Sequence, residues 1–373
     1  RDLHVSLRRQ RQMCIRDRYG RDKIEEHKIN TLTPRRYGGT LSWLAADGKV
    51  FEQTDGIAAS EAIEKLDDFA NTDTPFFLAV GFFRPHTPFV APKKYFDLYE
   101  REKIEIPEIS SDYLATLPGP AVKSIRAKKS QLNLEKEQAQ EIKEAYYATI
   151  SFVDAQVGRI LDQLETSGLD KNTVVVFTSD HGYHLGEHGH WQKNTLFENA
   201  TRVPLIISAP SSENKGVKSI SPVELIDLYP TLMDLTNINT PEHVVGKSLK
   251  PIMKNVNASV RESALTRWRK GYSIKTKRYR LTKWGRNGEL GYELYDHKND
   301  KNELINLADN KDYFKVMDSL KLEIKQRIID ASAIPKDVGR QFENIKPMHK
   351  EKNITFGDIH DLEGEIIQLK KIK

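Results

Sequence analysis

The sequence predicts an α/β protein with a mostly parallel sheet flanked by helices, followed by a smaller C-terminal α+β subdomain with an antiparallel sheet. In the first part, short and wholly apolar runs alternate with helical patterns. After about residue 260, short segments rich in aromatic and β-branched residues are separated by Gly and Asn turns. The length of 373 residues allows one large or two smaller domains with a proper core.

Apolar residues at near-helical spacing predict the helices of the first part, over residues 56–70, 139–166 and 222–235. Gly168 would end the long second helix, since glycine readily adopts the left-handed conformation of a helix end. Ser221, Pro222 and Glu224 have the spacing of a capping box with proline at the first helical position. We therefore expect the third helix to open there.

Three apolar runs predict strands, at residues 76–82 (FFLAVGF), 173–178 (TVVVFT) and 203–208 (VPLIIS). Each run is short, apolar throughout and bounded by turn signals, which is typical of a strand buried on both faces. A strand, a crossover helix and a further strand imply parallel pairing with right-handed connections.

The second part is expected to form a small antiparallel sheet with strands over residues 262–268, 271–276, 278–284 and 290–296. A final helix near 311–331 would turn five apolar residues inward: Phe314, Met317, Leu320, Ile324 and Ile328. Residues 336–373, with 8 basic and 7 acidic residues, are expected to be a mobile tail with a short helix near 362–372.

The predicted organisation has four regions. Residues 1–20 are rich in Arg and lack both a continuous apolar stretch and a regular period, so we expect them to be non-native or disordered and to lie outside the fold. A mitochondrial transit peptide is the alternative for this segment. Residues 21–258 would form the α/β domain, residues 259–335 the C-terminal subdomain, and residues 336–373 the tail.

Charge and composition exclude several classes of protein. The formal net charge is +5, but residues 1–36 carry +6 and the remaining 337 residues sum to −1. This argues against a nucleic-acid-binding protein with a basic folded surface. The longest apolar run, residues 76–83, is far shorter than the roughly 20 residues of a membrane span. The single Cys excludes a disulfide framework.

Residues 178–193 (TSDHGYHLGEHGHWQK) begin where the predicted strand 173–178 ends. Ligands of open α/β sheets gather at the carboxyl ends of strands, so Asp180 and His181 are candidate metal ligands there. Oxygen-rich sets favour calcium or magnesium, and imidazole-rich sets favour zinc. A lone Asp-His pair could also cap a helix, but the strand context, the glycines and Lys193 favour a metal site.

Residues 84–88 (RPHTP) follow the predicted strand 76–82. Arg84 and His86 could bind an anion there, and His86 could transfer a proton. A loop histidine is by itself more often a surface residue. Two such loops at neighbouring strand ends favour a shared site.

The body resembles the sulfatase family of the alkaline-phosphatase superfamily, most closely its iduronate-2-sulfatase-like branch. The matching stretches are residues 75–89, 178–204, 223–235, 271–284 and 293–307, of which 178–204 is the most specific. The resemblance implies an alkaline-phosphatase-like fold and an active-site Ca²⁺ bound by Asp180 and His181. It also implies that His86 and Lys193 are catalytic contacts to the sulfate group, and that Arg84 and Tyr183 bind substrate, with Arg84 replacing the family's lysine.

The resemblance further implies hydrolysis of sulfated carbohydrates by a formylglycine nucleophile, made from Cys or Ser in a C/S-x-P-x-R motif. No such motif occurs: Cys14 is followed by Ile-Arg-Asp-Arg, and no Ser-x-Pro-x-Arg is present. The N-terminal Asp-Asp pair that completes the family's calcium site, which belongs before residue 45, is missing as well. We therefore expect an N-terminally truncated sulfatase that is inactive alone. The family implies a periplasmic or secreted location; the oligomeric state is not predicted.

Two other functions stay open. One is a phosphoesterase of the same superfamily, in which similar Asp-His-Gly loops bind metals. The other is a non-catalytic protein that binds sulfated glycans. The nucleophile motif would distinguish the first from a sulfatase, and a stable 373-residue form would favour the second.

Overall fold

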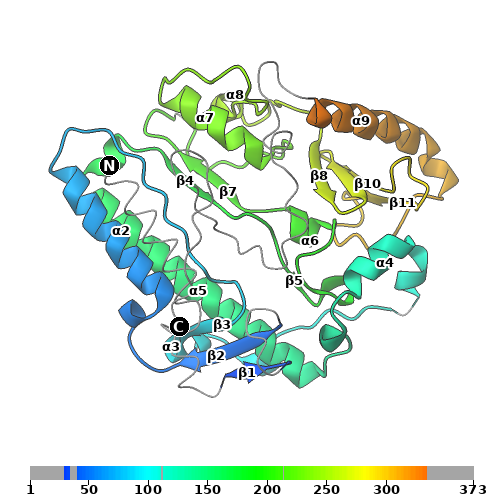
Figure 1. Ribbon diagram of the computed structural model, residues 1–373, viewed down its shortest axis with the longest axis horizontal. Coiled ribbons are helices and arrows are strands. Elements are labelled where there is room, and N and C mark those ends of the chain that lie inside the picture. Colours follow the sequence, from blue (N-terminus) through cyan, green and yellow to red (C-terminus); the bar gives the residue numbers. More distant parts are fainter. Residues whose placement is uncertain (1–28, 34–39, 111, 213, 334–373) are drawn as a thin grey trace, which may run out of the picture.

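The computed structural model describes residues 29–33, 40–110, 112–212 and 214–333 (Figure 1). Its α-helices are α2 (Thr54–Ala70), α3 (Lys93–Phe96), α4 (Gly119–Ile125), α5 (Lys136–Thr166), α6 (Glu198–Thr201), α7 (Leu228–Leu235), α8 (Lys250–Lys254) and α9 (Phe314–Ser332). Its strands are β1 (Asn30–Thr31), β2 (Ser42–Ala46), β3 (Phe89–Pro92), β4 (Val175–Thr178), β5 (His184–Leu185), β6 (Trp191–Gln192), β7 (Leu205–Ser208), β8 (Ala264–Trp268), β9 (Gly271–Lys275), β10 (Tyr279–Trp284) and β11 (Tyr292–Asp296).

Several expectations lie outside these residues: those for residues 1–20 with Cys14, for the tail 336–373, and for the helix near 362–372. Across the described ranges, none of the helices combines the length and the apolar character that crossing a bilayer requires.

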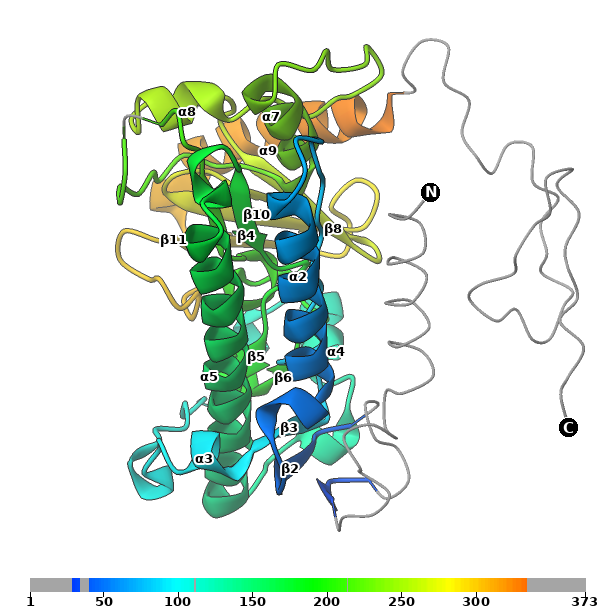
Figure 2. The ribbon, with the colours of Figure 1, turned by 90° about the vertical axis from the view of Figure 1, so that its left-hand side faces the viewer.

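Helices α2 and α5 confirm the two long helices predicted from the sequence, and they run side by side (Figures 1 and 2). Arg159 of α5 joins them by donating to the Ser60 hydroxyl at 3.0 Å. The opposite flank of α5 buries Ile142 and Phe152 completely against β2 and β3. Burial of such a side chain stabilises a fold by roughly 1.5–3 kcal/mol. Gly168, with φ of +73°, follows the end of α5 as predicted.

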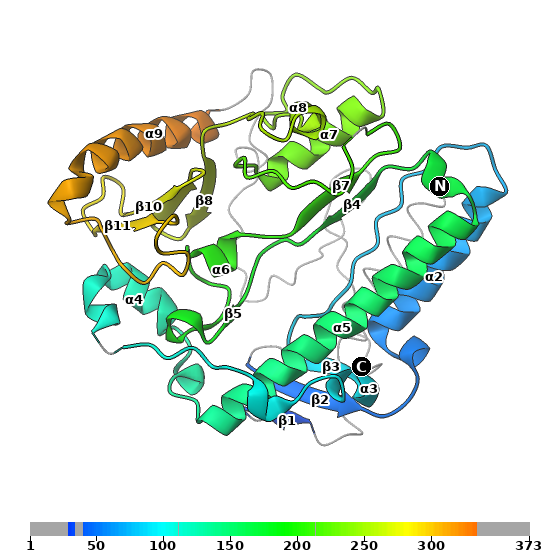
Figure 3. The ribbon, with the colours of Figure 1, turned by 180° about the vertical axis from the view of Figure 1, so that it is seen from behind.

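Strand pairing in the body is mixed rather than uniformly parallel. Strand β2 pairs parallel with β3 and antiparallel with β1. Strand β4, within the predicted run 173–178, pairs antiparallel with β7, within the predicted run 203–208. The segment between them folds into the β5–β6 hairpin and the four-residue α6, not into a crossover helix (Figure 3). Because parallel pairing needs such a crossover, the expected parallel pairing is wrong for these two strands.

Residues 76–82 do not form the predicted strand, although the chain is apolar throughout. Exposed and partly buried residues alternate along them, and Phe77 is 64% exposed. A strand is defined by hydrogen bonds to a neighbour, and among the described residues no strand pairs with this segment. The apolar composition was therefore not sufficient to identify a strand.

The C-terminal part contains the predicted four-stranded antiparallel sheet, in the order β11-β10-β9-β8. Helix α9 covers one face, where Met317, Leu320 and Ile324 pack against Ile274 and Leu281 (Figure 1). The expectation for Phe314 is wrong, because this residue begins α9 and is 49% exposed. The other face of the sheet packs against the body.

The helix predicted over 222–235 corresponds to α7, which begins six residues later than predicted, at Leu228. A 3-10 turn (Leu225–Asp227) precedes α7, and Glu224 is its N-cap. The backbone N–H of Glu224 donates to the Asp227 carboxylate at 2.8 Å. Ser221 donates instead to the carbonyl of Ala258 at 2.5 Å, so the predicted capping box at Ser221 is wrong.

Candidate functional site

Asp180 and His181 lie just beyond β4, at the carboxyl end of that strand. The Ser179 hydroxyl donates to the carbonyl of His181 at 3.0 Å and so turns the chain there. The side chain of Asp180 is 83% exposed and that of His181 is 33% exposed. A dissolved cation or substrate can therefore reach both groups.

His181 is the centre of a three-residue contact. Its Nδ1 lies 2.9 Å from the carbonyl oxygen of Gly182, which assigns the ring proton to Nδ1 and leaves the lone pair on Nε2. The ammonium of Lys193 donates to this Nε2 at 2.7 Å, and a carboxylate oxygen of Asp180 lies 3.5 Å from it. A carboxylate, an imidazole lone pair and an ammonium thus converge at one point.

The hairpin of β5 and β6 brings Lys193 back to His181. The two strands pair through Leu185 and Trp191, and Trp191 is anchored in the core. Gly186 and Gly189 form the connecting turn with φ of +104° and +69°, values that L-residues rarely adopt. The glycines noted in the sequence are therefore required by the turn.

Gly182 is required by a close approach instead. Its N–H donates to the carbonyl of Ala200 at 2.8 Å, which ties the loop to α6. A Cβ at this position would lie 2.1 Å from the carbonyl oxygen of Asn199, closer than atoms can pack. Only glycine lets the segment after His181 lie against α6.

The donors at Asp180 and His181 fit part of a divalent-cation site. Calcium takes six to eight ligands, chiefly oxygens. The unprotonated nitrogen of a neutral imidazole can also coordinate a metal through its lone pair. A bound cation would compete with Lys193 for the lone pair on His181. In the described part of the chain, no third His, Cys, Asp or Glu side chain joins this pair. The assignment of Asp180 and His181 as metal ligands stays a prediction.

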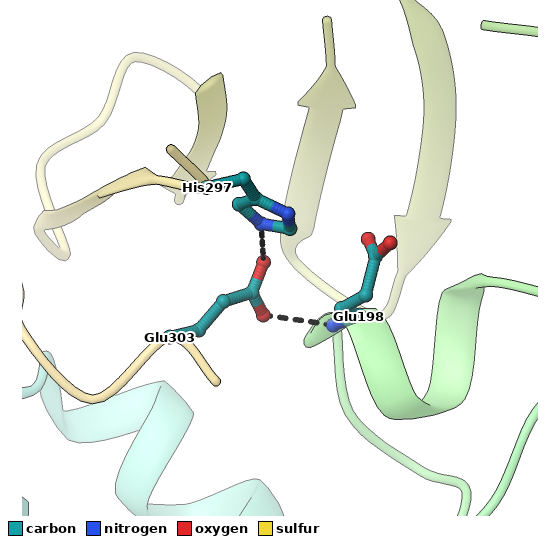
Figure 4. A group of neighbouring side chains, drawn as sticks. All are labelled: Glu198, His297 and Glu303. Carbon is teal, nitrogen blue, oxygen red and sulfur yellow. Dashed lines mark hydrogen bonds and ion pairs between the residues drawn. The ribbon is translucent and has the colours of Figure 1, made fainter. Parts of the chain in front are cut away.

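A second group of metal-ligating type lies elsewhere, between α6 and the C-terminal sheet (Figure 4). One ligand atom each of Glu198, His297 and Glu303 lies within 4.8 Å of the others. Arg280 already forms ion pairs with both carboxylates, at 2.5 Å from Glu303. A guanidinium at this position repels a cation, so we interpret the group as an ion-pair network that joins the two parts of the fold.

The loop with Arg84 and His86 is a compact turn. The backbone N–H of His86 donates to the carbonyl of Phe83 at 3.0 Å, and its Nδ1 donates to the carbonyl of Thr87 at 2.6 Å. Arg84 is only 5% exposed, and its Nε donates to the carbonyl of Val90 at 2.9 Å. These contacts make Arg84 part of the loop's internal support.

Asp55 is a residue of this loop's support that the sequence did not single out. It is buried in the first turn of α2, and its carboxylate accepts the backbone N–H groups of Phe83 and Arg84 at 2.7 and 3.0 Å. An acidic residue in a first helical turn has an ordinary explanation in the helix dipole. Its sequence position therefore gave no signal of the distant contact.

Tyr183 packs between the two loops. Its ring stacks on Tyr146 at 5.1 Å and meets Phe89 edge-on at 6.2 Å. Burial raises the pKa of its hydroxyl, which is enclosed without a hydrogen-bond partner among the described residues. Phe89 lies three residues after His86, so Tyr183 connects the loops through ring contacts. No hydrogen bond or ion pair between described residues joins His86 directly to Asp180, His181 or Lys193.

The other histidines of the segment, His184, His188 and His190, are buried, whereas His181 is partly exposed. Burial lowers the pKa of all three side chains. The pKa of His184 falls well below its usual value, that of His188 falls to about 4, and that of His190 is also lowered. His190 Nδ1 donates to the carbonyl of Ile125 at 2.8 Å, and His184 Nε2 lies 2.7 Å from the Thr195 hydroxyl. These three histidines are neutral and buried, and they support the hairpin of β5 and β6.

Comparison with known proteins gives two family matches. The family described as Sulfatase matches residues 11–238, and the family described as N-sulphoglucosamine sulphohydrolase, C-terminal, matches residues 186–330. A sulfatase from Formosa agariphila is 38% identical over 67% of this chain and 50% of its own length. Iduronate 2-sulfatase from Homo sapiens is 34% identical over 49% of this chain and 40% of its own.

Among solved structures, a phosphonate monoester hydrolase from Silicibacter pomeroyi has a TM-score of 0.68 at 23% identity, covering 76% of this chain and 61% of its own. This likeness shows the fold alone. The chain spans about half the length of the curated relatives it matches.

Proposed function

Since this chain belongs to the sulfatase family of the alkaline-phosphatase superfamily, we propose that it serves in the hydrolysis of sulfuric esters on sulfated carbohydrates. The observation that carries the proposal is the convergence of Asp180, His181 and Lys193 after β4. A sulfate ester is an anion with several oxygen acceptors, and an ammonium beside a cation-binding pair is suited to it.

In this proposal each side chain has a distinct task. Lys193 donates to a sulfate oxygen and offsets the charge that develops there. His86 gives a proton to the departing alcohol oxygen, a role suited to an imidazole. Asp180 and His181 would hold the calcium ion, which when bound would neutralise negative charge on the ester. Tyr183, through its ring contact with Phe89, and Arg84, through its hydrogen bond to Val90, support the segments that carry these groups.

Replacing Asp180 by Asn tests the metal assignment. The change keeps the size of the side chain and removes its charge, so we expect calcium affinity to fall by at least about tenfold. Titration calorimetry of this chain with calcium chloride measures the effect. Asp170→Asn is the matched control, since Asp170 is an exposed carboxylate ten residues earlier. Equal losses in both variants would refute a site at Asp180.

The catalytic competence of the chain is a separate proposal. Neither Cys-x-Pro-x-Arg nor Ser-x-Pro-x-Arg occurs in the 373 residues, so the family's nucleophile has no source in them. We expect no turnover of an aryl sulfate by this chain, measured as release of the phenol with calcium present. Measurable hydrolysis that Lys193→Met abolishes would overturn this expectation.

The alternatives have less support. A phosphonate monoester hydrolase shares the fold, but both matching families and the relatives named above are sulfatases. A role as a non-catalytic glycan-binding protein rests only on the missing motif. We also propose a periplasmic or secreted location, and a boundary between the α/β domain and the C-terminal subdomain near residues 258 and 259, between α8 and β8.

A further inference from the structure

The C-terminal sheet carries a strongly basic segment that the proposed reaction does not use. Residues 266–286 contain nine Lys and Arg residues and no Asp or Glu. They cover most of β8, β9 and β10. Such an excess of one charge within a sequence whose body is near neutral needs an explanation beyond solubility.

The strand register aligns part of this charge into one row. Arg267 of β8 is opposite Tyr272 of β9, Tyr272 is opposite Lys283 of β10, and Lys283 is opposite Tyr292 of β11. Residues opposite one another in a sheet share a face. The row spans four strands, a width of roughly 14 Å at the usual spacing between strands.

Cations and aromatic faces alternate along this row. The guanidinium of Arg267 lies 5.4 Å from the centre of the Tyr272 ring, and the ammonium of Lys283 lies 5.8 Å from the same ring. Lys321 of α9 extends the row, with its ammonium 5.1 Å from the Tyr292 ring. Arg267 is exposed and the other four residues are partly exposed, so a large ligand can reach them.

A shallow groove of about 410 Å³ continues the row at its Tyr292 end. Tyr292 and Lys321 line it together with Leu290, Asn306 and Asp309. Asp309 is the one acidic residue among those that line the groove. The opposite face of the sheet packs Trp284 and Tyr295 against Phe197 of the body. The row therefore faces away from α6 and the loop of Asp180.

We propose that the row formed by Arg267, Tyr272, Lys283, Tyr292 and Lys321 binds a sulfated polysaccharide outside the candidate active site. The choice of ligand rests on the proposed function. Sulfate groups pair with Arg and Lys, and sugar rings lay their apolar C–H faces on tyrosines. Basic and tyrosine side chains alternate along the row. A polysaccharide that presents sulfate groups and sugar-ring faces in turn could contact both kinds of side chain. This surface would hold a long substrate while its ends are processed.

The test measures heparin affinity of the 373-residue chain at physiological salt, with unsulfated dextran as the neutral probe. The triple variant Arg267→Gln, Lys283→Gln, Lys321→Gln is expected to bind heparin at least about tenfold more weakly. The control variant Lys65→Gln, Lys93→Gln, Lys171→Gln removes the same charge from exposed sites on the opposite part of the chain and should stay within about twofold. Equal losses in both variants would overturn the proposal, since net charge alone would then explain binding.

Three further measurements keep the result unambiguous. Tyr272→Leu retains apolar packing beside α9 and should still weaken heparin binding severalfold; unchanged affinity would contradict the stacking role. A 20-nucleotide DNA that binds as tightly as heparin would show a general polyanion surface and overturn the choice of ligand. Asp180→Asn should not alter heparin affinity. If the unaltered chain binds heparin but not calcium, the proposed function is contradicted and this site stands.

Discussion

Replacing Arg280 by Met is expected to destabilise the protein by about 3–5 kcal/mol. Arg280 is 2% exposed, and its guanidinium pairs with Glu303 and Glu198 and donates to Ser273 at 3.1 Å. Removing it leaves the Glu303 carboxylate buried with His297 as its remaining side-chain partner. An uncompensated buried charge costs far more than the ion pair gains over an apolar substitute.

The same network predicts how stability depends on pH. Burial alone would raise the pKa of Glu303, but Arg280 and His297 outweigh it and lower that pKa to about 2. A carboxyl group with a lowered folded pKa stabilises the fold above its unfolded value near 4.5, and this stability is lost as the pH falls toward about 2. In Arg280→Met the carboxylate of Glu303 loses this cation. Its contribution to stability above pH 4.5 should therefore shrink or change sign.

Urea denaturation of both forms at pH 7 and at pH 4 measures these effects. Arg202→Met is the matched control. Arg202 pairs with Glu198 of the same network at 3.6 Å, but its side chain is 78% exposed. A surface pair contributes about 0–1 kcal/mol, so the control should lose little. If the two variants lose equal stability, the interpretation of the network as the link between the two parts of the fold is wrong.

The elements that the sequence predicted correctly are those whose signal is local. The periodicity of α2 and α5 is contained within one segment each, as is the aromatic and β-branched composition of β8 to β11. Each of these elements formed where expected. The incorrect predictions concern which strands pair with one another. An apolar run such as residues 76–82 does not specify which strand will pair with it. The antiparallel pairing of β4 with β7 was decided by a connection that folds back as a hairpin.

The same distinction applies to the candidate site. Asp180, His181 and Lys193 are close in sequence, and glycine turns between them made their meeting predictable. The role of Asp55 was not predictable, because its contacts with the loop of Arg84 span 28 and 29 residues. Likewise, a histidine in a polar segment looks the same whether it is partly exposed, as His181 is, or buried, as His184 is. Burial of a single side chain depends on the whole fold.

Replacing Lys193 by Met is expected to change two affinities in opposite directions. Lys193 donates to the lone pair of His181 that a cation would need, so its ammonium competes with the cation and repels it. Without it, calcium should bind roughly tenfold more tightly, since charges at such distances interact by about 1–2 kcal/mol in water. The affinity for an aryl sulfate should instead fall by roughly 10- to 100-fold, the usual loss for a hydrogen bond to a charged group.

The opposite signs make this variant more informative than a simple loss. A lysine that only supports the hairpin would, when replaced, weaken calcium and sulfate-ester binding together through a displaced His181. A lysine remote from the ligands would change neither. Calorimetry with calcium and with an aryl sulfate separates these cases, and Lys171→Met, an exposed position before β4, controls for net charge. Tighter calcium binding together with weaker sulfate-ester binding requires that Lys193 lie beside both ligands, which is the arrangement that sulfuryl transfer needs.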